Sequence, residues 1–215
     1  MAIITISRGS LSGGRALAEC LSARLGYPNV GREVLQEAAE SFGVTEEAFR
    51  GKFETTPGIW SRLTKEREKY VLAVQTSLAE WCTRGNLIYH GLAGQRLLKG
   101  LPGVLRVRLI APLDKRVRAL MENHQHMSRS QAESFIEGID QDRVRWVKVM
   151  YGEEVNDPHG YDLTINLRRH SLESACATIA KATEQPRFQL TDEAEAEIFA
   201  FAAQCRERMS RMMGD

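Results

Sequence analysis

A glycine-rich turn near the N-terminus carries the clearest chemical signal in the sequence. Residues 9–16 read Gly-Ser-Leu-Ser-Gly-Gly-Arg-Ala, which fits the pattern G-x-x-x-x-G followed by a basic residue. Glycines let a backbone fold into a concave nest of N–H groups, and a helix N-terminus adds a partial positive charge, so such a turn binds phosphate oxygens. The residues predicted to bind the phosphates of a nucleotide are Gly9, Ser12, Gly13, Gly14 and Arg15.

The turn departs from the usual phosphate-binding motif at two positions. The motif has a lysine where this chain has Arg15, and a serine or threonine where it has Ala16. Arginine keeps the positive charge but prefers one fixed bidentate geometry. Because no hydroxyl follows Arg15, Mg²⁺ has no obvious protein ligand, and we expect the cofactors to be ATP and an Mg²⁺ held mainly by the nucleotide and water. The turn also admits a purely structural interpretation, in which its glycines only allow close packing.

The residues around the turn predict the elements that hold it. Residues 3–7 form an apolar, β-branched run typical of a buried parallel strand, and a helix follows the turn and ends at Gly26. Further strands are predicted at 87–90, 104–110 and 162–166, and further helices at 32–42, 61–83, 113–123, 130–150 and 171–181. Strands that alternate with helices predict an α/β fold, here a P-loop NTPase-type parallel sheet with helices on both faces.

The composition changes after Pro186, so we expect a main domain at 1–184 and a linker with an amphipathic C-terminal helix at 185–215. Thr191 is placed to cap this helix. Its apolar residues recur at helical spacing; they are Ile198, Phe201, Ala202, Cys205, Met209 and Met212. This apolar face must pack against another apolar surface. The helix docks on its own domain, forms a homodimer or leads into a further domain, and the sequence leaves the three open.

Composition limits the partners. The formal net charge is +1, with 29 Lys+Arg against 28 Asp+Glu, so no bulk field attracts a nucleic acid polymer or an anionic membrane. No run of about 18 apolar residues occurs, and the first apolar run is too short for a signal peptide. The four cysteines are scattered singly, and we interpret them as reduced thiols. These features predict a cytoplasmic protein whose partner is a nucleotide bound at a local site.

Several short motifs, taken in order, resemble the cytidylate kinase-like family. The first are the T-I-S-R strand and the S-G-G-R turn, which end at Arg8 and Arg15. Later ones are Arg32-Glu33-Val34-Leu35, then Ala111-Pro112-Leu113-Asp114-Lys115-Arg116, Asp140 with Arg143, Asp157-Pro158, and Tyr161-Asp162-Leu163-Thr164-Ile165-Asn166. The resemblance covers residues 3 to about 180 and implies a nucleoside-monophosphate-kinase-like core with a monophosphate-binding region and a mobile lid.

The resemblance also implies roles for individual residues. Arg116 would contact the donor nucleotide, and Arg15, Arg143 and Arg145 would be catalytic, with the last two closing over the transferred phosphoryl group. The residues that would bind the substrate are Arg32, Asp162 and Asn166. An ordinary basic helix face explains the Arg143 and Arg145 pattern equally well. No metal site is predicted, because His124 and His126 have no further ligand at a suitable spacing.

Two departures from the family pattern fall on the acceptor side. Gly31 stands where the family commonly has an aspartate, and Leu92 stands where it commonly has an arginine. The first functional hypothesis is an ATP-dependent phosphotransferase acting on a nucleoside monophosphate, CMP or dCMP by resemblance. The alternative is a nucleotide-binding protein with weak or absent catalysis, which these departures and Ala16 favour. In a third hypothesis, the C-terminal helix is the functional part of the protein and the kinase fold serves as a dimerisation scaffold.

Overall fold

A computed structural model of the chain describes residues 1–48, 64–124 and 126–214. Within these residues one parallel sheet has the strand order β2-β3-β1-β4-β5. The strands are β1 (Ile3–Arg8), β2 (Asn29–Val30), β3 (Leu87–Tyr89), β4 (Val104–Ile110) and β5 (Leu163–Asn166). The parallel α/β sheet predicted from the sequence is confirmed. The predictions missed β2, because two residues are too short to show a pattern.

β1 lies at the centre of the sheet and is buried on both faces. Ile3, Ile4 and Ile6 are at most 1% exposed, and their side chains alternate between the two apolar cores. Every residue of β1 from Ile3 to Arg8 pairs with β4. The chain passes from β1 to β2 on one side of it and later from β3 to β4 on the other side, so the strand order reverses at β1. In such sheets ligands bind beyond the carboxyl ends of the strands at this point.

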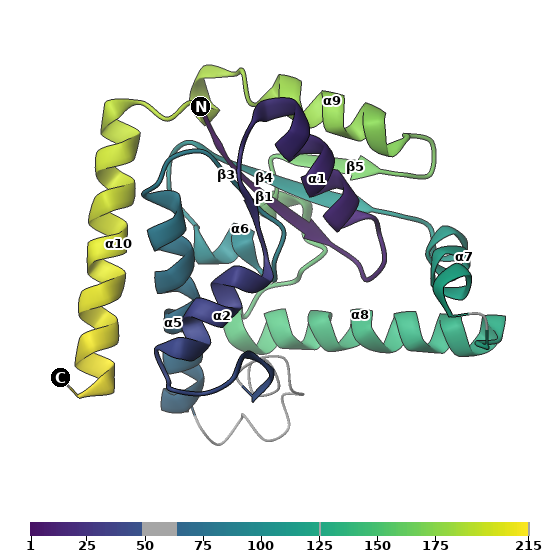
Figure 1. Ribbon diagram of the computed structural model, residues 1–215, viewed down its shortest axis with the longest axis horizontal. Coiled ribbons are helices and arrows are strands. Elements are labelled where there is room, and N and C mark those ends of the chain that lie inside the picture. Colours follow the sequence, from purple (N-terminus) through teal and green to yellow (C-terminus); the bar gives the residue numbers. More distant parts are fainter. Residues whose placement is uncertain (49–63, 125, 215) are drawn as a thin grey trace.

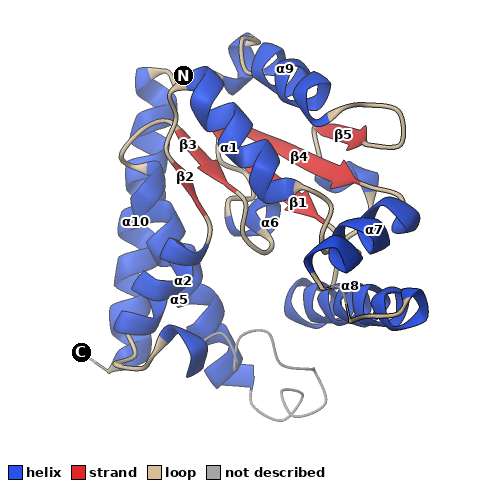
Figure 2. Cartoon of the chain, turned by 45° about the vertical axis from the view of Figure 1, so that its right-hand side comes forward, coloured by secondary structure: helices blue, strands red, loops and turns tan. Residues whose placement is uncertain are grey.

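Helices cover both faces of the sheet (Figure 2). On one face lie α1 (Gly14–Leu25) and α9 (Leu172–Ala182), which pack against each other (Figure 1). The other face is covered by α2 (Arg32–Glu40), α5 (Thr64–Cys82), α6 (Gly94–Leu97) and the C-terminal half of α8 (Arg129–Tyr151). α7 (Leu113–Asn123) packs on α8 through a small core of its own.

Cys20 of α1 forms a disulfide with Cys176 of α9. Their Cα atoms are 6.3 Å apart, although 156 positions separate them in the sequence. The expectation that all four cysteines are reduced thiols is therefore wrong for this pair, because the packing of α1 on α9 brings together two residues that look isolated in the sequence. Cys82 and Cys205 are free, as predicted, and both are buried.

The C-terminal helix α10 (Asp192–Met213) docks on its own domain, the first of the three expected possibilities. Figure 1 shows α10, in yellow, along the length of α5. Ile198, Cys205 and Met209 are at most 9% exposed within this contact, and Thr191 caps the helix by accepting a hydrogen bond from Ala194 N. The apolar face that motivated a homodimer is thus covered by the same chain.

Most other boundaries agree with the sequence within a few residues. Ser128 caps α8 in a reciprocal capping box with Gln131, and Ser171 caps α9. The short helix α6 was not predicted. Positions 61–63, the start of the helix predicted at 61–83, lie outside the described residues. No helix among the described residues is long and apolar enough to cross a membrane.

Candidate phosphate-binding site

The glycine-rich turn joins the carboxyl end of β1 to the N-terminus of α1, as the sequence predicts. Two of its residues have left-handed backbone, Leu11 with φ of 54° and Gly13 with φ of 80°. Gly13 is the N-cap of α1, and its carbonyl accepts the first helical hydrogen bond from Leu17 N at 2.9 Å. Left-handed residues just before a helix are one component of the backbone geometry of anion-binding nests.

A pocket lies over this turn. Its floor is formed by Arg8, Ser10 to Ala16 and Glu19, and residues of α7, its C-cap and α8 form the opposite wall. The wall residues are Leu120, His124, Phe135, Ile139 and Arg143. The pocket thus places one arginine of α8 across from a helix N-terminus, an arrangement that suits a polyphosphate.

A partly buried ion pair holds the turn against α8. Asp140 accepts hydrogen bonds from Ser10 N at 2.8 Å and Ser10 Oγ at 2.9 Å, and Arg116 Nη1 donates to Asp140 Oδ2 at 2.5 Å. Arg116 also donates to Ser10 O at 3.2 Å. Burial raises the pKa of Asp140, but the hydrogen bonds from Ser10 and Arg116 outweigh it, so this pKa lies below its ordinary value. Asp140 is therefore an ionised anchor, and Arg116 positions the turn through it.

A second pocket of about 300 Å³ adjoins the first. It lies between α2, the end of β3 and α8, and its lining is Arg8, Gly31, Arg32, Leu35, His90, Gly91, Leu92, Ile139, Asp142, Arg143 and Trp146. Arg8, Ile139 and Arg143 line both pockets. Two cationic side chains therefore stand where the pockets meet.

His90 takes the space left by the substitution at Gly31. A Cβ built on Gly31 would lie 2.6 Å from His90 Cε1, so the imidazole packs directly on the glycine. Burial and the nearby charge of Arg8 lower the pKa of His90, against a smaller opposite effect of Glu33. The ring is neutral at pH 7 and offers a donor and an acceptor to the second pocket.

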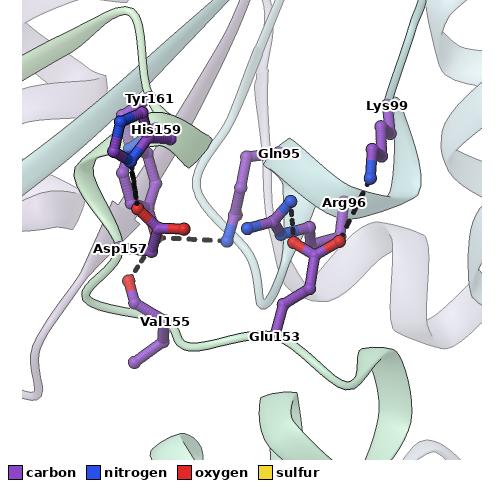
Figure 3. A network of polar contacts seen from close by, with 8 residues as sticks. All are labelled: Gln95, Arg96, Lys99, Glu153, Val155, Asp157, His159 and Tyr161. Atoms are coloured by element: carbon purple, nitrogen blue, oxygen red, sulfur yellow. Dashed lines mark hydrogen bonds and ion pairs between the residues drawn. The ribbon is translucent and has the colours of Figure 1, made fainter.

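A polar network fixes the segment between α8 and β5 against the end of β1. Tyr161 Oη donates to Val155 O at 2.7 Å, accepts from Gln95 Nε2 at 3.1 Å, and lies 3.2 Å from Ser7 Oγ. Figure 3 shows this tyrosine and Gln95 beside a second cluster, in which Glu153 bridges Arg96 and Lys99. The network includes Ser7, the residue before Arg8, so it positions the end of β1 that carries this arginine.

The structure brings together only part of the predicted site. Gly9, Ser12, Gly13 and Gly14 lie in the turn, and Arg143 faces both pockets. Arg15 borders the first pocket, but its side chain is 83% exposed and pairs with Glu19 at 2.9 Å. Arg32 borders the second pocket and pairs with Glu46 at 2.5 Å. The predicted roles of these residues stay predictions.

The structure does not place three other candidates with this group. Arg145 pairs with Asp142 on the exposed side of α8. Asp162 accepts a hydrogen bond from Arg106 N at 2.8 Å beside the edge strand β5, and Asn166 accepts one from Arg168 N at 2.9 Å in the turn after it. None of these residues lines either pocket.

Sequence reasoning missed Arg8 and His90 as members of the site. Arg8 is the last residue of the first strand. In the sequence it was recognised only as part of the T-I-S-R motif, and the motif does not indicate where its side chain points. The available signal was the second glycine of the Gly13-Gly14 pair, which leaves space that another residue must fill.

The described residues offer Mg²⁺ no dedicated site. No group of three His, Cys, Asp or Glu side chains comes together among them. Asp140, which contacts the turn, is already bonded to Ser10 and Arg116, and Glu19 of the first pocket pairs with Arg15. The residues present therefore do not fit an ion held by the protein.

The fold and the sequence both have relatives. The crystal structure of an uncharacterized protein from Eubacterium ventriosum ATCC 27560 matches with a TM-score of 0.66 and 16% identity, over 86% of this chain and 99% of that chain. Shikimate kinase from Bacteroides thetaiotaomicron matches with a TM-score of 0.52 and 12% identity, again over 86% of this chain and 99% of that chain. At these identities the likeness shows the fold alone, a P-loop kinase type of parallel sheet. No curated protein is similar enough to count as a relative.

The family is shown by sequence. The profile of the cytidylate kinase-like family matches residues 3–169, a span that includes the turn, both pockets and the strands β1 to β5. The same family was expected from the motifs between Arg8 and Asn166. The chain belongs to the cytidylate kinase-like family.

Proposed function

We propose that the protein transfers the γ-phosphoryl group of ATP to a nucleoside monophosphate, with CMP or dCMP as the first acceptors to test. The observation that carries the proposal is the pair of adjoining pockets, one over a helix N-terminus and one beside it, with Arg8 and Arg143 at their junction. Phosphoryl transfer depends on positioning and on neutralising charge between donor and acceptor, and cations at this junction would supply both.

The first pocket suits the donor. Its floor is the turn before α1, so backbone N–H groups and the helix terminus would bind the polyphosphate. Any Mg²⁺ would arrive on the nucleotide, since no described cluster of carboxylates would hold it. The second pocket suits the acceptor, because Arg8 and Arg143 would receive its phosphate, and Trp146, Leu35 and His90 would contact its base or sugar.

One observation favours the alternative, a nucleotide-binding protein with weak or absent catalysis. Arg15, the basic residue expected to grip the phosphates, is 83% exposed and paired with Glu19. If no other cation replaced it in the transition state, the site would bind a triphosphate through its backbone alone.

A coupled assay of ADP release across CMP, dCMP, UMP, AMP and GMP tests the proposal, together with the thermal shift produced by each nucleotide. We expect ADP release that depends on one or two monophosphates. Thermal stabilisation by ATP without ADP release would establish the alternative. Absence of both effects would contradict both functions.

Two arginines of α8 provide a matched pair for the same assay. Arg143 faces both pockets, whereas Arg145 pairs with Asp142 on the exposed side of the helix. We expect Arg143→Met to lower kcat about 100-fold or more, the usual loss when one charge-stabilising donor is removed, and Arg145→Met to cost much less. Equal losses in the two variants would contradict the assignment of Arg143 to the junction.

A further inference from the structure

The structure gives the phosphate-binding turn a different register from the one its sequence suggests. In the motif G-x-x-x-x-G-K-[ST], the lysine directly follows the last glycine of the loop and begins the helix. Here the last left-handed glycine is Gly13, which caps α1, and the first helical residue is Gly14. Gly14 therefore occupies the place of the lysine, Arg15 the place of the serine or threonine, and Arg8 the place of the first glycine.

The side chain of Arg8 fills the space that a side chain at Gly14 would need. A Cβ built on Gly14 would lie 1.7 Å from Arg8 Cδ and 2.2 Å from Arg8 Nε. Real side chains never approach so closely, so Arg8 and a lysine at position 14 exclude each other in this arrangement. A cation thus crosses the first turn of α1 from the end of β1 instead of from the helix.

Arg8 has the surroundings of a group that awaits an anion. It lines both pockets, yet its guanidinium has no hydrogen bond or ion pair with any of the described residues. Burial, and then the charge of Arg143, lower the pKa of Arg8 to about 10, so it stays protonated at pH 7. Leaving a cation partly buried beside another cation is unfavourable, and phosphate oxygens at the junction would relieve this.

We propose that Arg8 replaces the P-loop lysine and is the catalytic cation that contacts the transferred phosphoryl group between the two pockets. The inference rests on the proposed function. In the reaction, an oxygen of the acceptor phosphate forms a bond to the γ-phosphorus, and the bond between that phosphorus and the β,γ-bridging oxygen breaks. The bridging oxygen leaves with the electron pair as part of ADP. Arg8 keeps its proton and donates N–H groups to the oxygens on which charge develops.

The central experiment replaces Arg8 and places a lysine at position 14, the first residue of α1. The variants are Arg8→Met, Arg8→Ala, Arg8→Ala with Gly14→Lys, and Arg15→Met, with Arg24→Met on the exposed end of α1 as the control for loss of an arginine. We expect Arg8→Met to lower kcat about 100- to 1000-fold, as loss of one preorganised donor does. Arg15→Met should lose less than tenfold. The double variant should regain at least tenfold over Arg8→Ala, because a lysine at position 14 then has both the space and the motif's geometry.

Binding is measured separately, by calorimetric titration of inorganic tripolyphosphate and of ATP into each variant. Arg8→Met should bind tripolyphosphate at least tenfold more weakly than the wild type, and circular dichroism with thermal unfolding checks that each variant folds. If Arg8→Met and Arg8→Ala do not fold, the double variant, in which the Gly14→Lys side chain refills the space of Arg8, is compared with the wild type and Arg15→Met. Turnover that the double variant keeps and that Arg15→Met loses overturns the inference.

The outcomes separate this inference from the proposed function. Turnover in the wild type that survives Arg8→Met, or that Arg15→Met abolishes, overturns the inference and leaves the function standing. Tripolyphosphate binding that depends on Arg8 without turnover toward any monophosphate overturns the function and leaves Arg8 as the phosphate-binding cation. A wild type that does not bind tripolyphosphate or ATP overturns both.

Discussion

At the scale of single residues, two glycines of this chain have opposite surroundings. Gly14 begins α1 under the side chain of Arg8, with 1.7 Å between its ideal Cβ and Arg8 Cδ. Gly138 lies inside α8, and nothing lies within 4 Å of its ideal Cβ. Both glycines are helical, so a general preference for alanine in helices would act on both alike.

We therefore expect alanine to have opposite effects at the two positions. Gly138→Ala should stabilise the protein by about 0.5–1 kcal/mol, the usual gain from removing a helical glycine. Gly14→Ala should destabilise it by about 1–3 kcal/mol, because the new methyl group displaces a packed side chain. Urea unfolding of the two variants and the wild type measures both values. Stabilisation by Gly14→Ala would show that Arg8 moves away freely.

At the scale of elements, Asp140 is a contact through which α8 holds the glycine-rich turn. Its partners are Ser10 and Arg116, and its side chain is 27% exposed. Asp142, two positions along the same helix, lines the second pocket, pairs with Arg145 and is 47% exposed. Comparing the two aspartates tests a carboxylate that is bonded to the glycine-rich turn against a more exposed one that is not.

Asp140→Asn should lower the free energy of unfolding at pH 7 by about 1–3 kcal/mol, and Asp142→Asn by less than about 1 kcal/mol. The folded-state pKa of Asp140 lies below its ordinary value, so its contribution is present above the unfolded pKa, near 4, and is lost as the pH falls through the folded pKa. The gap between wild type and Asp140→Asn should therefore close between pH 5 and pH 2. Urea midpoints across that range measure it, and a gap independent of pH would contradict the ionised anchor.

The contact between α10 and α5 gives a second prediction at this scale. Ile198 is 1% exposed in that contact, whereas its neighbour Phe199 is 55% exposed. Ile198→Ala should cost about 2–4 kcal/mol, the usual cost of removing a buried aliphatic side chain, and Phe199→Ala should stay within about 0.5 kcal/mol of the wild type. Thermal and urea unfolding measure both. Equal small effects would indicate that α10 separates from α5 in solution.

The elements also show how much of the fold could be predicted from the sequence. β4 and α7 agree with their predicted bounds because turn residues enclose each one, and Thr191 is a cap that was recognised from the sequence. β2 and α6, with 2 and 4 residues, carry too little periodicity to be recognised. The position of the glycine-rich turn between β1 and α1 was predicted, because it depends on backbone and glycine spacing. The place of Arg8 in the site was missed, because the direction of a side chain at the end of a strand depends on packing from distant parts of the chain.

At the scale of the whole molecule, the disulfide between Cys20 and Cys176 joins the first helix to a helix near the far end of the chain. Such bonds persist in oxidising surroundings and are rare in the cytosol, so the redox state of this pair depends on where the protein resides. Cys82 and Cys205 are buried and unpaired, and burial raises the pKa of each thiol, the first to about 12.

Replacing Cys20 and Cys176 together by serine should lower the free energy of unfolding by about 2–4 kcal/mol under non-reducing conditions. A reductant should lower the stability of the wild type by a similar amount and leave the double variant unchanged. Thiol titration of the denatured, unreduced wild type should find only Cys82 and Cys205, and reduction should reveal all 4 cysteines. If four thiols react before reduction, the bond is not formed in the protein as purified.

The same bond makes most of the chain a covalent ring. Any single proteolytic cut between Cys20 and Cys176 opens the ring but leaves both fragments attached to each other. A nicked molecule would keep β1, the phosphate-binding turn and α1 joined to α9, and would migrate as one band on a non-reducing gel and as two after reduction. Limited proteolysis should therefore yield a form that remains in one piece until the disulfide is reduced.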